Sequence, residues 1–241
     1  MSLPPTLSDG YGLALHTSSP ELGLALSNFR GDSRCQSWNL GRSLSTDLHH
    51  YMQNFLQPQG WSDLTFLAVA KGPGGFTGTR IGVVTARTLA QQLDIPLFAI
   101  SSLAAFAYSV GDRLPLGTKS VGSEPTVDIA VQMPAQRGEL FTAIYGTQAT
   151  TLAPNSEPNQ QTKPAPTQAW AALFPDTVLT PETWQQVLGQ WQRPYRLLQA
   201  DSGLGGSAAS LLQLAYQQWC SDIRPLWSEA LPFYGQHPVV G

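Results

Sequence analysis

Residues 64–93 read LTFLAVAKGPGGFTGTRIGVVTARTLAQQL, and this stretch decides the fold class that we predict. Residues 64–70 form a nearly continuous apolar run, which is typical of a strand buried on both faces of a sheet. Four glycines follow within residues 72–80. From about Thr79 to Leu93 the apolar residues recur with a helical period. The stretch therefore predicts a buried strand, a tight glycine-rich loop and a helix.

The sequence on either side extends this pattern. Residues 95–100 predict a second buried strand, and Ser101 and Ser102 are suited to begin a short helix that runs to about Val110. Upstream, residues 11–15, 22–29 and 34–40 predict three short strands in an antiparallel meander. A helix is predicted between the meander and the buried strand, over residues 43–56. A meander followed by alternating strands and helices indicates an α/β fold with a mixed sheet.

The second half of the chain predicts a separate lobe. Residues 111–125 are rich in Gly, Ser and Pro and provide the best boundary. We assign residues 1–111 to an N-terminal lobe and 112–241 to a C-terminal lobe. In the second lobe we predict strands at 126–132, 139–145 and 195–200 and helices at 181–191 and 207–219. Residues 147–168 contain little to bury and predict a mobile loop, and residues 223–241 predict a tail.

Composition restricts the functional classes. The 241 residues carry a formal net charge of −3, so the basic surface that is typical of nucleic-acid-binding proteins is lacking. Cys35 and Cys220 are the only cysteines, which indicates reduced thiols rather than a disulfide framework. Neither a signal peptide nor an apolar run of membrane-spanning length is recognisable. We expect a soluble, cytoplasmic protein that does not bind RNA or DNA directly by itself.

The glycine loop is the most informative segment. It consists of Gly72, Pro73, Gly74, Gly75, Phe76, Thr77, Gly78, Thr79 and Arg80. Backbone N–H groups between a strand and a helix can bind an anion. Glycines also allow tight turns and close backbone packing without any ligand, which is the more common case. The loop is not a Walker A motif, because no Gly-Lys-Ser/Thr closes it.

Other candidate motifs are weaker. Residues 203–208 fit G-x-G-x-x-A, but Asp222 lacks the strand that a dinucleotide site requires, so a strand-to-helix turn is the simpler interpretation. His49 and His50 point in different directions on one helix and cannot chelate one metal together. No metal-binding or nucleophile-elbow motif is present, so we predict no metal and no catalytic residue. Asp128, Glu139 and Asp201 could meet in space or could serve as caps.

Two helices suggest a protein-binding surface. The helix at 43–56 carries one apolar stripe, and the helix from Thr79 has apolar residues on more than one face. The surplus apolar area is suited to docking of a partner. We predict a partner interface formed by Leu44, Leu48, Tyr51, Met52, Phe55, Arg80, Ile81, Val84 and Thr88.

The glycine loop resembles a family signature. Residues 72–82 are similar, almost residue for residue, to the G-P-G-S-F-T-G-x-R-I-G motif of the TsaB (YeaZ) family, and residues 95–103 continue the match in register. The resemblance is good over residues 13–107 and thin after Gly146. It implies an actin-like (RNase H-like) α/β fold of two lobes, each a mixed sheet flanked by helices. It also implies a role in forming N6-threonylcarbamoyladenosine (t6A) in tRNA.

The resemblance also implies partners. Family members pair with a TsaD-type enzyme, and the two predicted helices would be the docking elements here. A TsaE-like ATPase is a further candidate partner, and self-association as a homodimer through the same helices is expected when the enzyme is absent. TsaD-type proteins hold a metal with a His-x-x-x-His pair, which this chain lacks. The chain therefore looks like the helper subunit.

The chain departs from the family at three places. His16-Thr17-Ser18 stands where the family usually has Asp-Thr-Ser, and residues 134–139 begin with Pro134 where the family has Asp. Residues 232–236 match the C-terminal Pro-x-Tyr-Leu-Arg only in part. Each departure removes a charge from what would be an ATPase cleft. A neutral His cannot replace a carboxylate that orients a metal-bound phosphate.

The leading hypothesis is a non-catalytic subunit that binds and activates a TsaD-like enzyme, with no cofactor of its own beyond weak or partner-shared ATP. The alternative is an independent ATP-binding ATPase or phosphotransferase of the same fold. A peptidase ranks last, because neither its metal ligands nor a nucleophile can be identified.

Overall fold

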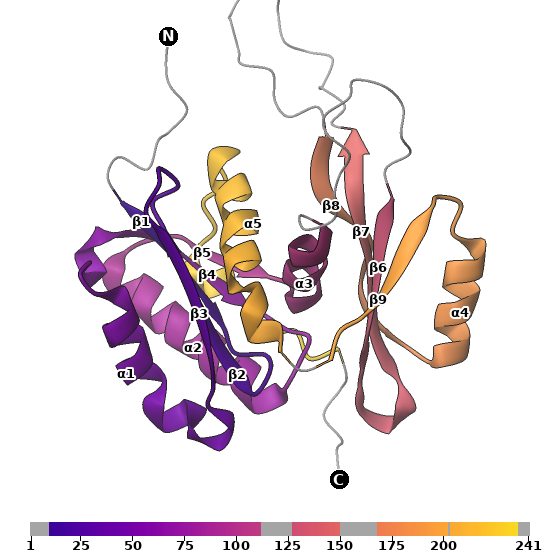
Figure 1. The fold of residues 1–241 in the computed structure, drawn as a ribbon, viewed down its shortest axis with the longest axis horizontal. Coiled ribbons are helices and arrows are strands. Elements are labelled where there is room, and N and C mark those ends of the chain that lie inside the picture. Colours follow the sequence, from indigo (N-terminus) through magenta and orange to yellow (C-terminus); the bar gives the residue numbers. More distant parts are fainter. Residues whose placement is uncertain (1–9, 112–126, 150–167, 202, 236–241) are drawn as a thin grey trace, which may run out of the picture.

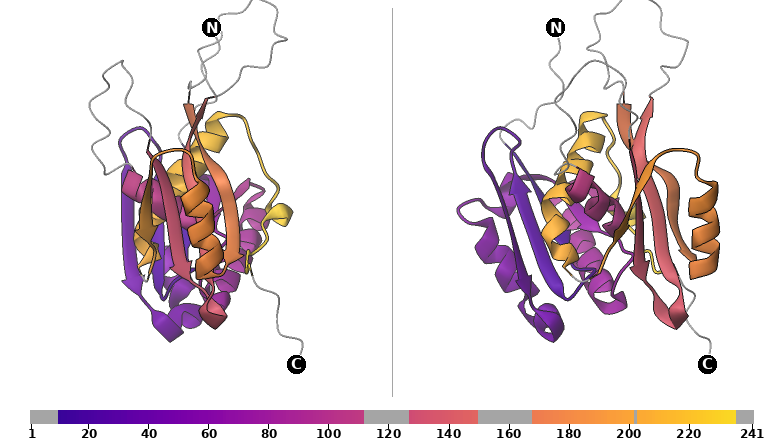
Figure 2. Two further views of the ribbon diagram at one scale, coloured as in Figure 1. Left: turned by 90° about the vertical axis from the view of Figure 1, so that its right-hand side faces the viewer. Right: turned by 45° about the vertical axis from the view of Figure 1, so that its right-hand side comes forward.

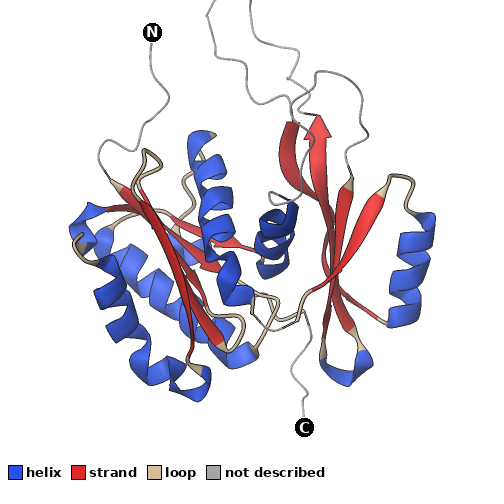
Figure 3. Cartoon of the chain, in the orientation of Figure 1, coloured by secondary structure: helices blue, strands red, loops and turns tan. Residues whose placement is uncertain are grey.

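The computed structural model describes residues 10–111, 127–149, 168–201 and 203–235. Most of the loop predicted at 147–168 and most of the boundary predicted at 111–125 lie outside the described residues. Within them, the chain forms two mixed sheets and five α-helices, arranged in five alternating layers (Figures 1 and 3). The predicted α/β class with two mixed sheets is confirmed. No described helix is long and apolar enough to cross a membrane.

The first sheet has the strand order β3-β2-β1-β4-β5. Its strands are β1 (Tyr11–His16), β2 (Glu21–Ser27), β3 (Ser33–Asn39), β4 (Leu64–Ala70) and β5 (Leu97–Ile100). The first three pair antiparallel, as predicted for a meander, and β1, β4 and β5 run parallel. Helices α1 (Leu44–Leu56) and α2 (Phe76–Leu93) cover the outer face.

Alternate side chains of the central strands pack against different layers. On β1, Leu13 and Leu15 face α1 and α2, whereas Ala14 faces the interior between the two sheets. On β4, Leu67 and Val69 face outward in the same way, and Phe66 faces inward. Successive side chains of a strand point to opposite faces. A strand with helices on both sides therefore reads as one continuous apolar run.

The second sheet repeats part of the first with the order β8-β7-β6-β9. Its strands are β6 (Asp128–Pro134), β7 (Leu140–Ala149), β8 (Gln168–Leu179) and β9 (Tyr195–Gln199). β6 pairs antiparallel with β7 and parallel with β9, as β1 does with β2 and β4. Helix α4 (Pro181–Gln190) packs on the outer face through the buried Trp184 and Leu188. The left view of Figure 2 shows α4 in front of this sheet.

Two helices fill the space between the sheets. These are α3 (Ser102–Gly111) and α5 (Ala208–Cys220), which share one core with the inner faces of both sheets (Figure 1). By sequence α5 falls in the predicted C-terminal lobe of residues 112–241, yet it packs against β1 and β2 of the first sheet. The chain also returns to this sheet after α5, because Leu97 N–H donates to the carbonyl of Pro225 at 3.3 Å. The described part of the predicted tail, residues 223–235, packs in this region, with Ala230 buried in the core.

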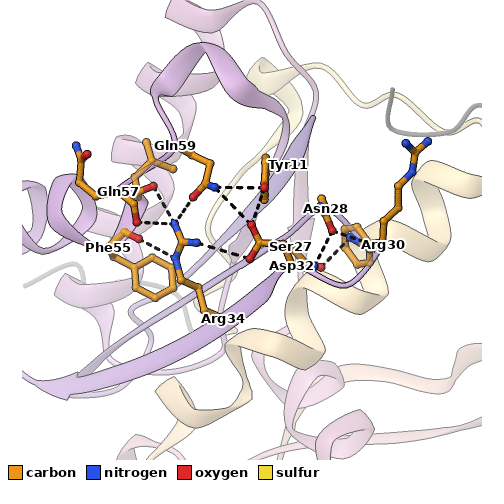
Figure 4. Close-up of polar contacts among 11 residues, drawn as sticks. Tyr11, Ser27, Asn28, Arg30, Asp32, Arg34, Phe55, Gln57 and Gln59 are labelled. Carbon is orange, nitrogen blue, oxygen red and sulfur yellow. Dashed lines mark hydrogen bonds and ion pairs between the residues drawn. The ribbon is translucent and has the colours of Figure 1, made fainter. Parts of the chain in front are cut away.

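Arg34 of β3 closes the C-terminal end of α1 (Figure 4). Its guanidinium donates to the carbonyl oxygens of Phe55 at 3.1 Å, Leu56 at 2.8 Å and Gln57 at 3.0 Å. It also donates to Oε1 of Gln59 at 2.5 Å. The last carbonyls of a helix have no partner within the helix, so a cation placed there satisfies them. Arg34 thereby fixes the end of α1 against the edge of the first sheet.

We expect Arg34→Met to lower the free energy of unfolding by about 1–2 kcal/mol, because several carbonyls lose a charged donor at a partly exposed site. Urea unfolding followed by circular dichroism measures this loss. Arg196→Met on β9, which removes a cation from another strand, is the matched control. Equal stability of the two variants would show that the contacts of Arg34 with α1 contribute nothing measurable.

Candidate functional site

A cleft of about 1240 Å³ opens between the two sheets. The loop after β1, the glycine loop, the turn between β6 and β7 and the C-terminal segment all contribute to it. The lining residues include Thr17, Ser18, Ser19, Arg42, Gly74, Gly75, Phe76, Thr77, Gly78, Pro134, Gln136, Arg137, Asp201 and Tyr234. Most of the predicted motif loop therefore lines one cavity, together with residues from all three segments where the chain departs from the family pattern, although His16 itself does not line it.

The glycine loop wraps around the turn after β1. Thr17 Oγ1 donates to the carbonyl of Gly78 at 2.8 Å, and Gly75 N–H donates to the carbonyl of Ser18 at 2.8 Å. A Cβ atom at Gly78 would lie 2.2 Å from the Thr17 carbonyl oxygen, and one at Gly74 would lie 2.2 Å from that of Ser18. Real Cβ atoms do not approach this closely. These glycines are therefore required by close backbone packing, which was one of the two interpretations left open above.

Phe233 and Tyr234 of the C-terminal segment pack against the glycine loop. Phe233 N–H donates to the carbonyl of Lys71 at 2.6 Å, and a Cβ atom at Gly72 would lie 2.4 Å from the Phe233 carbonyl oxygen. Gly72 also has a φ of +97°, which favours glycine. The Tyr234 ring lies 4.4 Å from the Phe76 ring, between centroids. The partial C-terminal match thus lies beside the glycine loop.

His16 ends β1 and is completely buried. Neither ring nitrogen has a hydrogen-bond partner among the described residues. Burial lowers the pKa of His16 to about 3, because the charged imidazolium would lose its hydration. The side chain is therefore a neutral imidazole at ordinary pH and does not line the cleft.

The described side chains that line the cleft carry more positive than negative charge. Arg42 and Arg137 line the cleft, and Asp201 is the only acid among the lining residues that the structure describes. Divalent cations that carry phosphates are bound by carboxylate oxygens, usually one or two of them together with water. No group of three or more His, Cys, Asp or Glu side chains within the described ranges is placed to hold a metal ion. The cleft can attract an anion but offers few ligands for a magnesium–phosphate complex.

The other candidate carboxylates do not meet in the cleft. Asp128 is fully buried at the start of β6, where Arg193 lies 2.8 Å from Oδ1 and Trp191 Nε1 donates to Oδ2 at 2.9 Å. It joins the second sheet to the segment before β9. Asp222 is exposed beyond the end of α5 and pairs with Arg224 at 3.4 Å, without a following strand. The glycines of residues 203–206 let the chain approach Gly23 of β2, as expected for a strand-to-helix turn.

The predicted partner interface is partly wrong. Leu44, Leu48, Met52 and Phe55 are buried in the core between α1, α2 and the first sheet. The apolar stripe of α1 therefore packs on the sheet, and the exposed face of α1 is polar. Tyr51 and Ile81 are half-buried, whereas Arg80, Val84 and Thr88 are exposed on α2. Periodicity identifies an apolar face but does not show whether the face meets the sheet or a partner.

One polar cluster was missed by the sequence analysis. Ser101, Tyr145 and Asp176 contact one another between the sheets, beside Lys71 and Trp170. Asp176 lies in β8, which was not predicted, because Pro175-Asp176 reads as a turn signal. β8 is an edge strand, where proline is tolerated. The apolar residues on either side, Trp170 to Phe174 and Val178-Leu179, were the available signal for a strand.

The fold and the cleft define a two-lobed α/β protein of the actin-like (RNase H-like) class. The family model for TsaD, described as tRNA N6-adenosine threonylcarbamoyltransferase, matches residues 41–157. The TsaB protein of Bacillus subtilis, named as a tRNA threonylcarbamoyladenosine biosynthesis protein, is 34% identical over 140 residues, which is 55% of this chain and 54% of that protein. The TsaB protein of Escherichia coli is 27% identical over 142 residues, 58% and 52% of the two chains.

Solved structures show the same fold over nearly the whole chain. YeaZ from Pseudomonas aeruginosa superposes with a TM-score of 0.66 at 23% identity, over 93% of this chain and 100% of that one. A Pseudomonas aeruginosa protein described as similar to peptidase YEAZ gives 0.68 at 21% identity, over 94% and 100%. The chain is therefore similar in sequence to TsaB proteins over part of its length, and its fold is similar to that of YeaZ. Its alignments span about half the length of the curated relatives.

Proposed function

We propose that this chain is a non-catalytic subunit that binds and activates a TsaD-like transferase in the synthesis of t6A in tRNA. The observation that carries the proposal is the buried, neutral His16 at the end of β1. In an ATPase a carboxylate at this position would orient a metal-bound phosphate, and Asp201 is the only acid among the described residues that line the cleft. The names of the TsaB relatives support a role in t6A synthesis.

The docking surface that we propose is the exposed stripe of α2. Phe76, Arg80, Val84 and Thr88 follow one another at intervals of four residues and are all exposed, with Phe76 and Val84 each 53% accessible. Exposed large apolar residues on one helix face are suited to bundle-type packing against a second helix. The stripe begins at the mouth of the cleft, so a partner bound there would also contact the cleft.

The partner that fits this stripe is a TsaD-like subunit. The TsaD family model matches residues 41–157, which contain α1 and α2, so such an enzyme carries related helices. Related surfaces can pair about an approximate two-fold axis, as identical surfaces do in a homodimer. Self-association through the same stripe would then compete with the enzyme by mass action.

The test is Val84→Asp in the full chain, mixed with the TsaD-like protein of the same organism. We expect at least about a tenfold weaker complex, since the variant places a charge in an apolar contact. Co-elution and t6A formation on tRNA are the measurements. Val127→Asp is the matched control, because Val127 is 51% exposed but lies beside the second sheet. Unchanged binding by Val84→Asp excludes the α2 stripe, and failure of the wild-type chain to bind or activate excludes the function.

The alternative is an independent ATPase or phosphotransferase. Its support is the cleft itself, which at about 1240 Å³ has room for a nucleotide and presents two arginines. Calorimetry with Mg-ATP on the isolated chain separates the two functions. Tight binding with turnover favours the enzyme, whereas weak binding without turnover favours the subunit.

A further inference from the structure

A second cavity, of about 320 Å³, lies between the sheets and shares no lining residue with the cleft. Lys71 follows β4 and Ser101 follows β5, so both come from the carboxyl ends of neighbouring parallel strands. Tyr145 on β7 and Asp176 on β8 face them from the second sheet. Trp170 and apolar residues of α3 and α5 complete the walls. The volume is at the lower end of known small-molecule sites.

Two hydrogen bonds hold Asp176 in place, but both reach the same carboxylate oxygen. Tyr145 Oη donates to its Oδ1 at 2.5 Å, and Ser101 Oγ donates to the same oxygen at 2.9 Å. Ser101 Oγ also accepts from the N–H groups of Leu103 and Ala104, which leaves its proton for Asp176. No hydrogen bond reaches Oδ2 from any described residue. The carboxylate is therefore oriented by its surroundings, with one acceptor oxygen left over.

Lys71 supplies the opposite charge without forming an ion pair. Its ammonium makes no salt bridge or hydrogen bond with the described residues, although its charge lowers the pKa of Asp176. Burial is the larger effect and raises the pKa of Asp176 above its usual value. The indole N–H of Trp170 is buried and also lacks an acceptor among the described residues. The ammonium of Lys71, the second carboxylate oxygen of Asp176 and the indole N–H of Trp170 thus line one cavity without hydrogen-bond partners among the described residues.

We propose that this cavity binds a small α-amino acid as the zwitterion, with its ammonium at Asp176 and its carboxylate at Lys71. The partly buried carboxylate of Asp176 has no ion-pair partner among the described residues, although Lys71 lines the same cavity, and an unpaired charge withdrawn from water is costly. A zwitterion bridges the two charges without bringing them together, and the indole N–H of Trp170 can donate to its carboxylate. The apolar walls, which include Ile100 and Leu214, favour a small aliphatic side chain.

The inference is independent of the proposed function, because it concerns binding by the chain alone. The experiment titrates the full chain with valine, with isobutylamine and with isovalerate, and follows amide shifts by NMR. The amine lacks the carboxylate and the acid lacks the ammonium. We expect valine to bind at least about tenfold more tightly than either analogue, since each loses one charged contact. A panel of glycine, alanine, threonine and leucine then defines the preferred side chain.

Two variants test the contacts. Asp176→Asn keeps an oxygen that accepts from Tyr145 and Ser101 and removes the charge, and Lys71→Met keeps the length of the chain. Each should weaken valine binding by about tenfold or more, whereas Asp201→Asn in the cleft should leave it unchanged. Binding should also weaken as the pH falls and Asp176 takes up a proton. No binding by any amino acid at millimolar concentration overturns the proposal, and so does equal binding of valine, isobutylamine and isovalerate.

Discussion

Acidification is expected to destabilise this protein through His16, by about 1.4 kcal/mol per pH unit between pH 6 and pH 3. The pKa of His16 is about 3 in the folded chain and close to the usual histidine value of 6.5 in the unfolded chain. Below pH 6.5 the unfolded state therefore binds a proton that the folded state excludes. Stability from this residue is complete above pH 6.5 and is lost as the pH falls. Over the whole window the loss reaches roughly 4 kcal/mol.

The variant that isolates this effect is His16→Leu, compared with the wild type by urea unfolding at several pH values. Carboxylates also titrate in this range, so the quantity of interest is the difference between the two proteins. We expect the difference to grow in favour of the variant as the pH falls. At pH 7 the variant should be about as stable as the wild type, because leucine removes two buried nitrogens that lack partners. A difference that does not depend on pH would mean that His16 gains a proton without unfolding.

Gly78→Ala is expected to lower the free energy of unfolding by about 1–3 kcal/mol through overpacking. The new Cβ atom would lie 2.2 Å from the Thr17 carbonyl oxygen, which is backbone and cannot rotate away. Alanine is preferred to glycine within a helix by about 0.5–1 kcal/mol, so the clash has to outweigh this gain. Thermal and urea unfolding measure the net effect.

Gly189→Ala is the matched control for this prediction. Gly189 lies in α4, and a Cβ atom there would meet nothing within 4 Å. The same substitution should therefore stabilise the protein by about 0.5–1 kcal/mol. If Gly78→Ala lowers the free energy of unfolding and Gly189→Ala raises it, the loss at Gly78 is due to its contact with the loop after β1. If both substitutions stabilise the chain, the glycine loop is not closely packed, and anion binding becomes the better interpretation of its glycines.

Much of the N-terminal half could be predicted from the sequence, because local patterns are strong there. The run at residues 64–70 and the meander before it were confirmed as strands within one or two residues. Ser101 begins α3 as expected, by accepting from two backbone N–H groups. The glycine loop was recognised as the marker of the candidate site. Local propensity and long-range packing agree in these segments.

The prediction failed where one local pattern fits several environments. The apolar stripe of α1 was assigned to a partner but belongs to the core, because α1 meets the sheet with its only apolar face. β8 was not predicted because its Pro175 is tolerated only on an edge strand, and the strand order is not visible in the sequence. α5 was placed in the C-terminal lobe by its position in the chain. Its packing on β1 and β2 depends on contacts between residues about 200 positions apart.

The sequence by itself determined the α/β class, the central strands, the glycine loop and the family resemblance, since each depends on neighbouring residues in one segment. Only the tertiary structure decided which glycines are needed for packing against Thr17 and Ser18, and that His16 is buried and neutral. It alone brought Lys71, Ser101, Tyr145 and Asp176 to one cavity. Burial, pKa and the meeting of charges depend on distances between segments, and the order of residues along one segment does not contain those distances.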